Sequence, residues 1–211
     1  MNGVLHLSIE IGSRCNLANE HLKCPASVRQ FTDRPRLTTD RIAEIIRAAQ
    51  DLGFTGFVGF HFFNEPTMYA DRIAEVMDRV PDARYMLITN GYGPVDKRFS
   101  WVYHSPYGTE PYPFDDRIHN YDEPPVRRAS CWRPRVECAI DYTGMVALCC
   151  QDWRLTSHCG DIASGDVHEA LMVWSAKSRA VTLGSMPNAC SLCKGGQDKA
   201  EYERILANSG Y

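Results

Sequence analysis

The spacing of its cysteines constrains this chain more than any other feature of the sequence. Seven of the nine cysteines in its 211 residues lie between Cys131 and Cys193. The last two form Cys190-Ser-Leu-Cys193, a gap that can place two thiolates around one metal centre. Buried structural thiols are the alternative, because free cysteine packs like a small hydrophobic residue. The density and spacing favour a metal site, and they leave iron–sulfur and zinc open.

A predicted β-hairpin supplies two further thiols to this region. Residues 136–141 and 145–150 are apolar runs with β-branched members, and they flank Tyr142-Thr143-Gly144. Cys138 and Cys149 would then lie on neighbouring strands, close enough to share a ligand. The hairpin and the later cysteine pair together describe a pocket with sulfur on two sides.

The rest of the chain alternates apolar runs of strand and helix character. Strands are predicted over residues 4–10, 54–63, 85–89 and 99–104, and helices over residues 38–53, 69–80, 166–183 and 198–207. The order strand, helix, strand predicts βαβ units and a parallel sheet, with the helices outside a curved array. Glycine- and proline-containing turns interrupt the pattern over residues 92–130, which predicts a long connector.

Composition excludes several classes of function. The hydrophobic content of 44% and charged content of 23% are ordinary for a soluble globular protein. The formal charge of −3 argues against a general nucleic-acid or acidic-membrane surface. No stretch approaches a membrane span, and the N-terminus has no signal-peptide pattern. Clustered cysteines fit a reducing compartment, so we expect a cytoplasmic protein.

Motifs in the second half follow one another in a definite order. They are Cys131-x12-Gly144-x4-Cys149, Cys150-Gln-Asp152, Gly160-Asp-Ile162, a helix carrying Trp174, and Cys190-x2-Cys193. Over roughly residues 126–196 this order resembles the SPASM/twitch extension of radical S-adenosylmethionine enzymes, which carries an auxiliary [4Fe-4S] cluster. The resemblance favours iron–sulfur over zinc. It implies Cys131, Cys149, Cys190 and Cys193 as ligands, with Cys138 as a competitor, and places Asp152 and Trp153 on the substrate side. Turn chemistry and packing are the alternatives for those last two residues.

The first half also resembles this family at the ends of its predicted strands. Asn64-Glu65-Pro66 is similar to the Gly-Glu-Pro motif, which holds the amino group of S-adenosylmethionine. Thr89-Asn90-Gly91 is similar to the family's third-strand ending, and Arg14-Cys15-Asn16-Leu17 to the start of its cluster loop. The resemblance therefore implies S-adenosylmethionine binding by Asn64, Glu65, Pro66, Thr89 and Asn90.

The cluster loop departs from the family pattern Cys-x3-Cys-x2-Cys. Only Cys15 and Cys24 occur here, and position 19 holds Asn19. His21 lies two residues before Cys24, so it is either the third ligand or a solvated loop histidine in a vestigial site. A neutral imidazole in place of a thiolate raises the reduction potential of a cluster, which opposes reductive cleavage of a sulfonium.

These observations predict an α/β protein with a shortened partial (β/α) barrel of radical S-adenosylmethionine type over residues 1–125, connector included. A small α+β, cysteine-rich twitch/SPASM-like domain follows over residues 126–211. The expected function is oxidation or cross-linking of a peptide or small-molecule substrate through a 5′-deoxyadenosyl radical. The expected cofactors are one or two [4Fe-4S] clusters and S-adenosylmethionine, and the electron donor is a flavodoxin or ferredoxin. A non-catalytic or redox iron–sulfur partner protein and a zinc module are the alternatives.

Overall fold

A computed structural model describes residues 1–18, 25–28, 34–105, 131–185, 187, 189–190 and 193. Within these residues the strands form one sheet in the order β4-β3-β2-β1-β5-β6. Neighbours from β4 to β5 pair in parallel, and β6 pairs antiparallel with β5. The strands are β1 (His6–Ile9), β2 (Phe57–Gly59), β3 (Arg84–Thr89), β4 (Phe99–His104), β5 (Glu137–Ile140) and β6 (Val146–Ala147).

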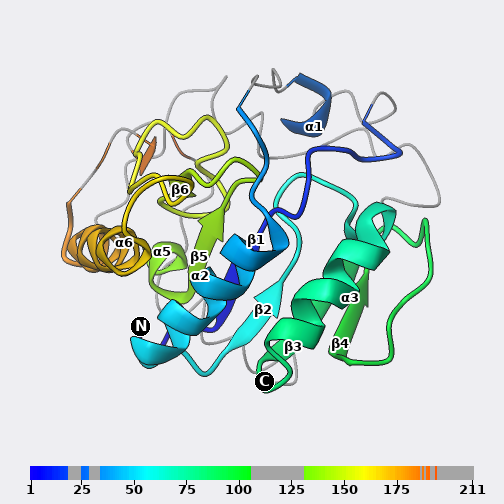
Figure 1. Ribbon diagram of the computed structural model, residues 1–211. Coiled ribbons are helices and arrows are strands. Elements are labelled where there is room, and N and C mark those ends of the chain that lie inside the picture. The colour runs from blue at the N-terminus through cyan, green and yellow to red at the C-terminus, as the bar shows by residue number, and fades with distance from the viewer. Residues whose placement is uncertain are drawn as a thin grey trace.

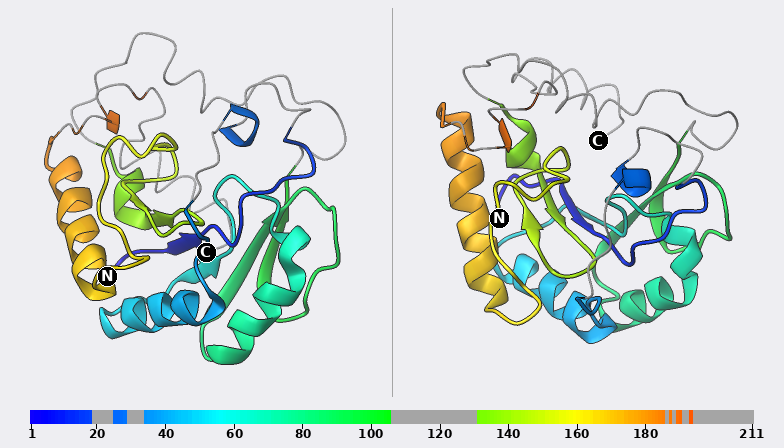
Figure 2. Two further views of the ribbon diagram at one scale, coloured as in Figure 1. Left: turned by 45° about the horizontal axis from the view of Figure 1, so that its top comes forward. Right: turned by 90° about the horizontal axis from the view of Figure 1, so that it is seen from above.

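Three longer helices cover one face of this sheet. They are α2 (Thr39–Asp51), α3 (Ala70–Arg79) and α6 (Val167–Thr182). Seen from above, they lie side by side along the outside of the curved sheet (Figure 2). Shorter elements are α1 (Pro25–Val28), the 3-10 helix η1 (Pro66–Tyr69) and α5 (Arg133–Val136) (Figure 1). The predicted parallel sheet with external helices is therefore confirmed.

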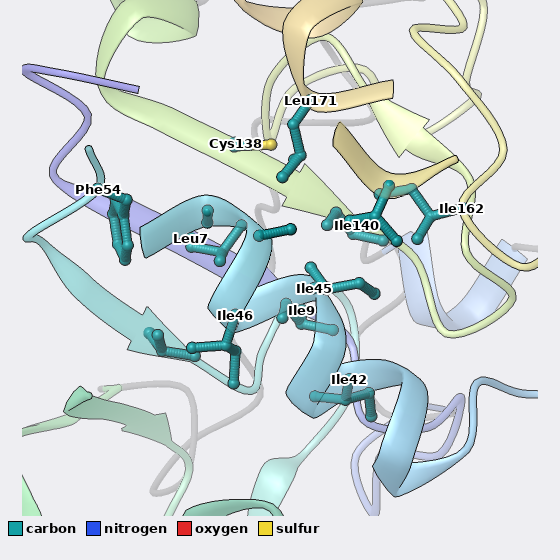
Figure 3. Close-up of a cluster of buried hydrophobic side chains, with 14 of the residues drawn as sticks. Leu7, Ile9, Ile42, Ile45, Ile46, Phe54, Cys138, Ile140, Ile162 and Leu171 are labelled. Carbon is teal, nitrogen blue, oxygen red and sulfur yellow. The ribbon is translucent and has the colours of Figure 1, made fainter. Parts of the chain in front are cut away.

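The main hydrophobic core lies between the sheet and these helices. Alternate residues of β1 and β5 point to it, as the two-residue period of a strand requires. Leu7 and Ile9 of β1 meet Ile42, Ile45 and Ile46 of α2 there (Figure 3). A smaller apolar cluster lies on the other face of the sheet and consists of Phe62, Phe63, Ala139, Ala147 and Trp153. The face of the sheet opposite α2, α3 and α6 is thus partly filled by aromatic side chains.

The strand predicted over residues 54–63 is much shorter in the structure. Phe54 donates its backbone N–H to Ala49 O and is therefore hydrogen-bonded to the C-terminal turn of α2 instead of to the sheet. After Phe60 the Asn64 side chain forms a local turn, because it accepts from Phe62 N and donates to Phe60 O. Local side-chain hydrogen bonds therefore take the chain out of the sheet, although its apolar run continues.

Other predicted elements are confirmed with small shifts in their ends. The strand over residues 99–104 is β4, and the hairpin is β5 and β6, although its second strand, predicted over residues 145–150, is only Val146–Ala147. Asp166 caps α6 by accepting from Glu169 N at 2.9 Å, as expected from a capping box. Gly144 turns the hairpin with φ of +95°, a conformation that favours glycine. The helix predicted over residues 198–207 lies outside the described residues.

The cysteine-rich half shares its sheet with the first half. β5 lies directly beside β1, with Leu7 opposite Cys138 and Ile9 opposite Ile140. Arg41 of α2 adds a second connection, since it donates to the carbonyl oxygens of Ile162 and Gly165. The predicted boundary between residues 125 and 126 lies outside the described residues. Among the helices of the described part, none is long and apolar enough to cross a membrane.

Candidate functional site

The candidate site of the first half lies where the parallel strands β1, β2 and β3 end. In open α/β sheets and barrels, ligands bind at the carboxyl ends of the strands. Cys15 follows β1, Glu65 follows β2, and Thr89 and Asn90 end β3. The fold therefore brings motifs separated by up to 75 residues to one edge of the sheet.

Glu65 is the centre of a hydrogen-bond network at this edge. Its side chain is 2% exposed. Glu65 Oε1 accepts from Thr67 N at 3.0 Å, Thr67 Oγ1 at 2.6 Å and Thr89 Oγ1 at 2.5 Å. Glu65 Oε2 accepts from Asn90 N at 2.8 Å. Each carboxylate oxygen has about two lone-pair sites, so protein donors saturate Oε1 and leave room on Oε2 for one more donor. Glu65 thus ties the ends of β2 and β3 together.

Asn90 connects this network to the start of the cluster loop. Its side-chain amide lies 3.8 Å from Cys15 Sγ and donates to Asn16 Oδ1 at 2.8 Å. Its backbone amide is held at the same time by Glu65. The structure therefore joins Cys15, Glu65 and Asn90 in one contiguous group.

The backbone before Cys15 is fixed on both sides by the segment that follows β2. Arg14 O accepts from Glu65 N at 2.9 Å, and Arg14 N donates to the Tyr69 hydroxyl at 2.8 Å. A Cβ atom on Gly12 would lie 2.3 Å from the Tyr69 ring, so glycine allows this close approach. The position of Cys15 is consequently set by tertiary contacts of its neighbours.

Apart from Thr89, the other residues that the sequence predicted for this site are not seen in the group of Cys15, Glu65 and Asn90 in the described structure. Asn64 is occupied by its own turn, and Pro66 opens η1. His21 and Cys24 lie outside the described residues, so their ligand roles stay predictions. Sequence analysis missed Glu10, which is 1% exposed and accepts from Phe63 N at 3.2 Å and Tyr142 N at 3.1 Å. The sequence signal that could have indicated Glu10 was its position as an acidic residue at the end of a predicted strand.

In the second half, cysteines near the hairpin and the later cysteine pair affect one another's thiol pKa values. Burial, followed by the thiols of Cys131 and Cys193, raises the pKa of Cys190 to about 12. Burial also raises the pKa of Cys149, and the thiols of Cys150 and Cys193 add to this effect. Cys193 thus influences both Cys149 and Cys190, and Cys131 influences Cys190, while the ligand roles of these four cysteines stay predictions.

Cys138 and Cys159 belong to the helix-facing core instead. Cys138 is fully buried on β5 and lies beside Leu171 of α6 (Figure 3). Burial raises its pKa well above the ordinary value, with a further contribution from Cys159. Cys159 donates to Ser157 O at 3.1 Å. Cys138 thus lies on β5 and packs among apolar residues, whereas Cys149 lies beyond the end of β6 and not on the strand where it was predicted.

Cys150 lies on the face of the sheet opposite the main core, next to two charged residues. Arg133 Nη1 donates to Cys150 Sγ at 3.2 Å. Burial opposes ionisation of Glu137, but a hydrogen bond from Cys150 and the charge of Arg133 outweigh it and lower the Glu137 pKa. Ser8 Oγ donates to Glu137 Oε1 at 3.2 Å. These residues form a polar cluster on the inner face of the sheet, which sequence analysis did not find.

Asp152 has the turn chemistry that was the alternative to a role on the substrate side. Its side chain is fully buried and accepts from Thr156 N, Thr156 Oγ1 and Ser157 N at 2.8, 2.9 and 3.0 Å. Trp153 packs in the smaller apolar cluster, with Arg154 over its ring. Trp174 donates its indole N–H to Leu148 O at 3.0 Å and fixes α6 to the end of the hairpin.

The thiols of the described part do not converge as the ligands of a single metal ion would. Within the described residues, no three His, Cys, Asp or Glu side chains converge closely enough to hold one metal ion. Cluster thiolates lie farther apart, because each binds a different iron of the cluster. Buried thiols with raised pKa values are costly as thiolates unless a cation compensates them, and iron does so.

Comparisons with known proteins identify similar structures. No protein-family model matches this chain, and no curated protein does. A crystal structure of BtrN in complex with AdoMet and 2-DOIA matches with a TM-score of 0.63 and 17% identity, covering 93% of this chain and 94% of that chain. A crystal structure of selenomethionine BtrN in an open conformation matches with a TM-score of 0.67 and 19% identity, covering 96% and 99%. At this identity the likeness establishes a fold shared with BtrN over nearly the whole length of both chains.

Proposed function

We propose that this protein is a radical S-adenosylmethionine enzyme with an auxiliary iron–sulfur cluster. Its structural neighbour BtrN is a radical S-adenosylmethionine enzyme and was crystallised with AdoMet. A reduced cluster on the Cys15 loop would supply the electron that cleaves bound S-adenosylmethionine to the 5′-deoxyadenosyl radical, which abstracts hydrogen from substrate. The chain's own residues bind and orient the reactants for that step.

One observation carries the proposal: Cys15, Glu65 and Asn90 form one hydrogen-bonded group at the carboxyl ends of parallel strands. Asn90 lies between the other two, since its backbone binds Glu65 and its side chain reaches Cys15 Sγ. A thiolate of the first cluster and the residues proposed to bind S-adenosylmethionine are therefore neighbours. Such proximity is required when cluster and cofactor react together.

Glu65 and its neighbours would hold the amino acid part of the cofactor. Four protein donors contact its two oxygens, so the side chain is fixed in orientation. Carbonyl groups of the 64–66 turn add acceptors beside it. We propose that this turn receives the amino group, as the similarity of Asn64-Glu65-Pro66 to the family motif suggests.

Cys131, Cys149, Cys190 and Cys193 would hold the auxiliary cluster. The mutual effect of their thiols on the pKa values of Cys149 and Cys190 supports this set. We propose that the substrate, a peptide or a small molecule, lies between this cluster and the ends of the parallel strands. A flavodoxin or ferredoxin would serve as electron donor.

A non-catalytic iron–sulfur protein is the second candidate. Two observations favour it: the first loop has only two thiols, Cys15 and Cys24, and protein donors already contact both oxygens of Glu65. Such a protein would keep the fold and the auxiliary cluster without binding S-adenosylmethionine. A zinc module, the third reading, would be colourless where an iron–sulfur protein is brown.

Anaerobic calorimetry of S-adenosylmethionine binding to iron-loaded protein separates the first two candidates. We expect binding in the wild type and a loss of about 1.5–3 kcal/mol in Glu65→Ala, equal to at least tenfold in Kd. Glu75→Ala, an exposed glutamate of α3, is the matched control and should bind normally. Equal affinity in wild type and Glu65→Ala would remove Glu65 from the cofactor site. A wild type that does not bind would favour the non-catalytic protein.

A further inference from the structure

Ala189, which precedes the proposed cluster ligand Cys190, contacts a serine in the segment that follows the hairpin. The amide of Ala189, directly before Cys190, donates to Ser157 Oγ at 2.9 Å. Both partners are buried, with Ala189 3% and Ser157 7% exposed. Cys193 N also donates to Cys190 O at 3.3 Å, so the two cysteines belong to one local turn. The Ser157 hydroxyl is therefore placed to fix the orientation of this turn.

Ser157 is itself held by Asp152. Asp152 accepts from Ser157 N at 3.0 Å and from both donors of Thr156. Burial raises the pKa of Asp152, although these hydrogen bonds act in the opposite direction. Asp152 follows the proposed ligand Cys149 by three residues, and Asp152 N donates to Cys149 O at 3.0 Å. One continuous set of hydrogen bonds thus runs from Cys149 through Asp152 and Ser157 to Ala189.

We infer that Asp152 and Ser157 are positioning residues for the auxiliary cluster, because they connect the hairpin ligand to the Cys190–Cys193 turn. This inference rests on the proposed function, since it presupposes that these thiols bind iron. Ligand-supporting partners of this kind orient metal ligands, and their removal commonly costs 10–100-fold in metal affinity. The hydrogen bonds fix the backbone next to Cys149 and Cys190 without contact to the metal.

The test compares Ser157→Ala and Ser157→Thr with a control serine of similar burial. Ser178 is fully buried in α6 and donates to Ser175 O, so Ser178→Ala removes a buried hydroxyl away from the Ala189 contact. In full-length, iron-loaded protein we would measure the rate of auxiliary iron release to a chelator. We expect Ser157→Ala to release this iron roughly 10–100-fold faster, with Ser178→Ala and Ser157→Thr near the wild-type rate.

A second readout does not depend on iron. Hydrogen exchange at the Ala189 amide should accelerate in Ser157→Ala and remain slow in Ser157→Thr and Ser178→Ala, because only the first loses the acceptor. Equal iron release from wild type and Ser157→Ala, or equal acceleration in Ser178→Ala, would overturn the positioning role. Neither of these two outcomes would change S-adenosylmethionine binding, so neither would contradict the proposed function. A wild type without auxiliary iron would contradict the proposed function instead, and unchanged Ala189 exchange in Ser157→Ala would contradict the contact itself.

Discussion

Asn90 donates its backbone amide to Glu65 Oε2 at 2.8 Å, and so the ends of β3 and β2 are joined at the edge where ligands bind. The side chain of Asn90 remains available for the cluster loop, and it points to Cys15 Sγ and Asn16 Oδ1. This division of roles between backbone and side chain makes Asn90 a sensitive position for the proposed chemistry.

Asn90→Ala should affect the first cluster more than the fold. The variant keeps the backbone hydrogen bond to Glu65 and loses the side-chain contacts to Cys15 and Asn16. We expect a stability loss of about 1 kcal/mol and a lower reduction potential, because an N–H group near a cluster sulfur raises the potential. Redox titration and thermal unfolding measure the two effects. Asn16→Ala, which loses one of these contacts, should show little change in potential, and an unchanged potential in Asn90→Ala would contradict the account.

Cys138→Ala and Cys149→Ala should separate packing from ligation. Cys138 lies in the helix-facing core, so its replacement should cost about 1 kcal/mol in stability and leave iron content unchanged. Cys149 lies among the proposed ligands, so its replacement should remove iron from about one cluster per chain. Iron and sulfide analysis of both anaerobic proteins gives the answer. Iron loss in Cys138→Ala with full iron in Cys149→Ala would reverse the assignment.

His6 should make stability dependent on pH. Burial lowers the pKa of His6 below its ordinary value of 6.5, although the charge of Glu137 opposes this shift. Below about pH 6.5 the unfolded chain therefore binds a proton at His6 before the folded chain does, and stability falls as the pH drops toward the folded-state pKa. Thermal unfolding of wild type and His6→Gln, followed from about pH 8 down to about pH 5.5, should show a weaker decline in the variant. Parallel curves would remove His6 from the explanation.

His21 is the position where the sequence departs most from the family pattern. If His21 is the third ligand of the first cluster, His21→Ala should lose roughly four irons per chain, whereas His21→Cys should keep them at a lower potential. Iron analysis and redox titration of the two variants test this role. Full iron content in His21→Ala would show that the imidazole is not a ligand.

The sequence predicted the parallel sheet well because buried apolar runs and helix caps are local signals. The apolar, β-branched runs on both sides of Tyr142-Thr143-Gly144 were sufficient to predict the hairpin, and Asp166 correctly indicated the start of α6. The end of β2 was predicted wrongly, because the Asn64 turn overrides an apolar run that continues to Phe63.

The contacts within the sites could not be predicted in the same way. The hydrogen bond between Ser157 and Ala189 spans 32 residues, and nothing in the local sequence of either residue indicates a partner. The ion-rich group of Arg133, Cys150 and Glu137 forms only when α5, the hairpin and the inner sheet face come together. The burial of Cys138 likewise depends on the register of β5 against β1, which no cysteine spacing specifies.

Formation of 5′-deoxyadenosine tests the central claim most directly. Anaerobic, iron-loaded protein would be mixed with S-adenosylmethionine and dithionite, and the product quantified by liquid chromatography. The account predicts 5′-deoxyadenosine from the wild type only when reductant is present, and none from Cys15→Ala, which loses a ligand of the first cluster. If a wild type that holds iron and binds S-adenosylmethionine forms no more product than Cys15→Ala, the protein is not a radical S-adenosylmethionine enzyme.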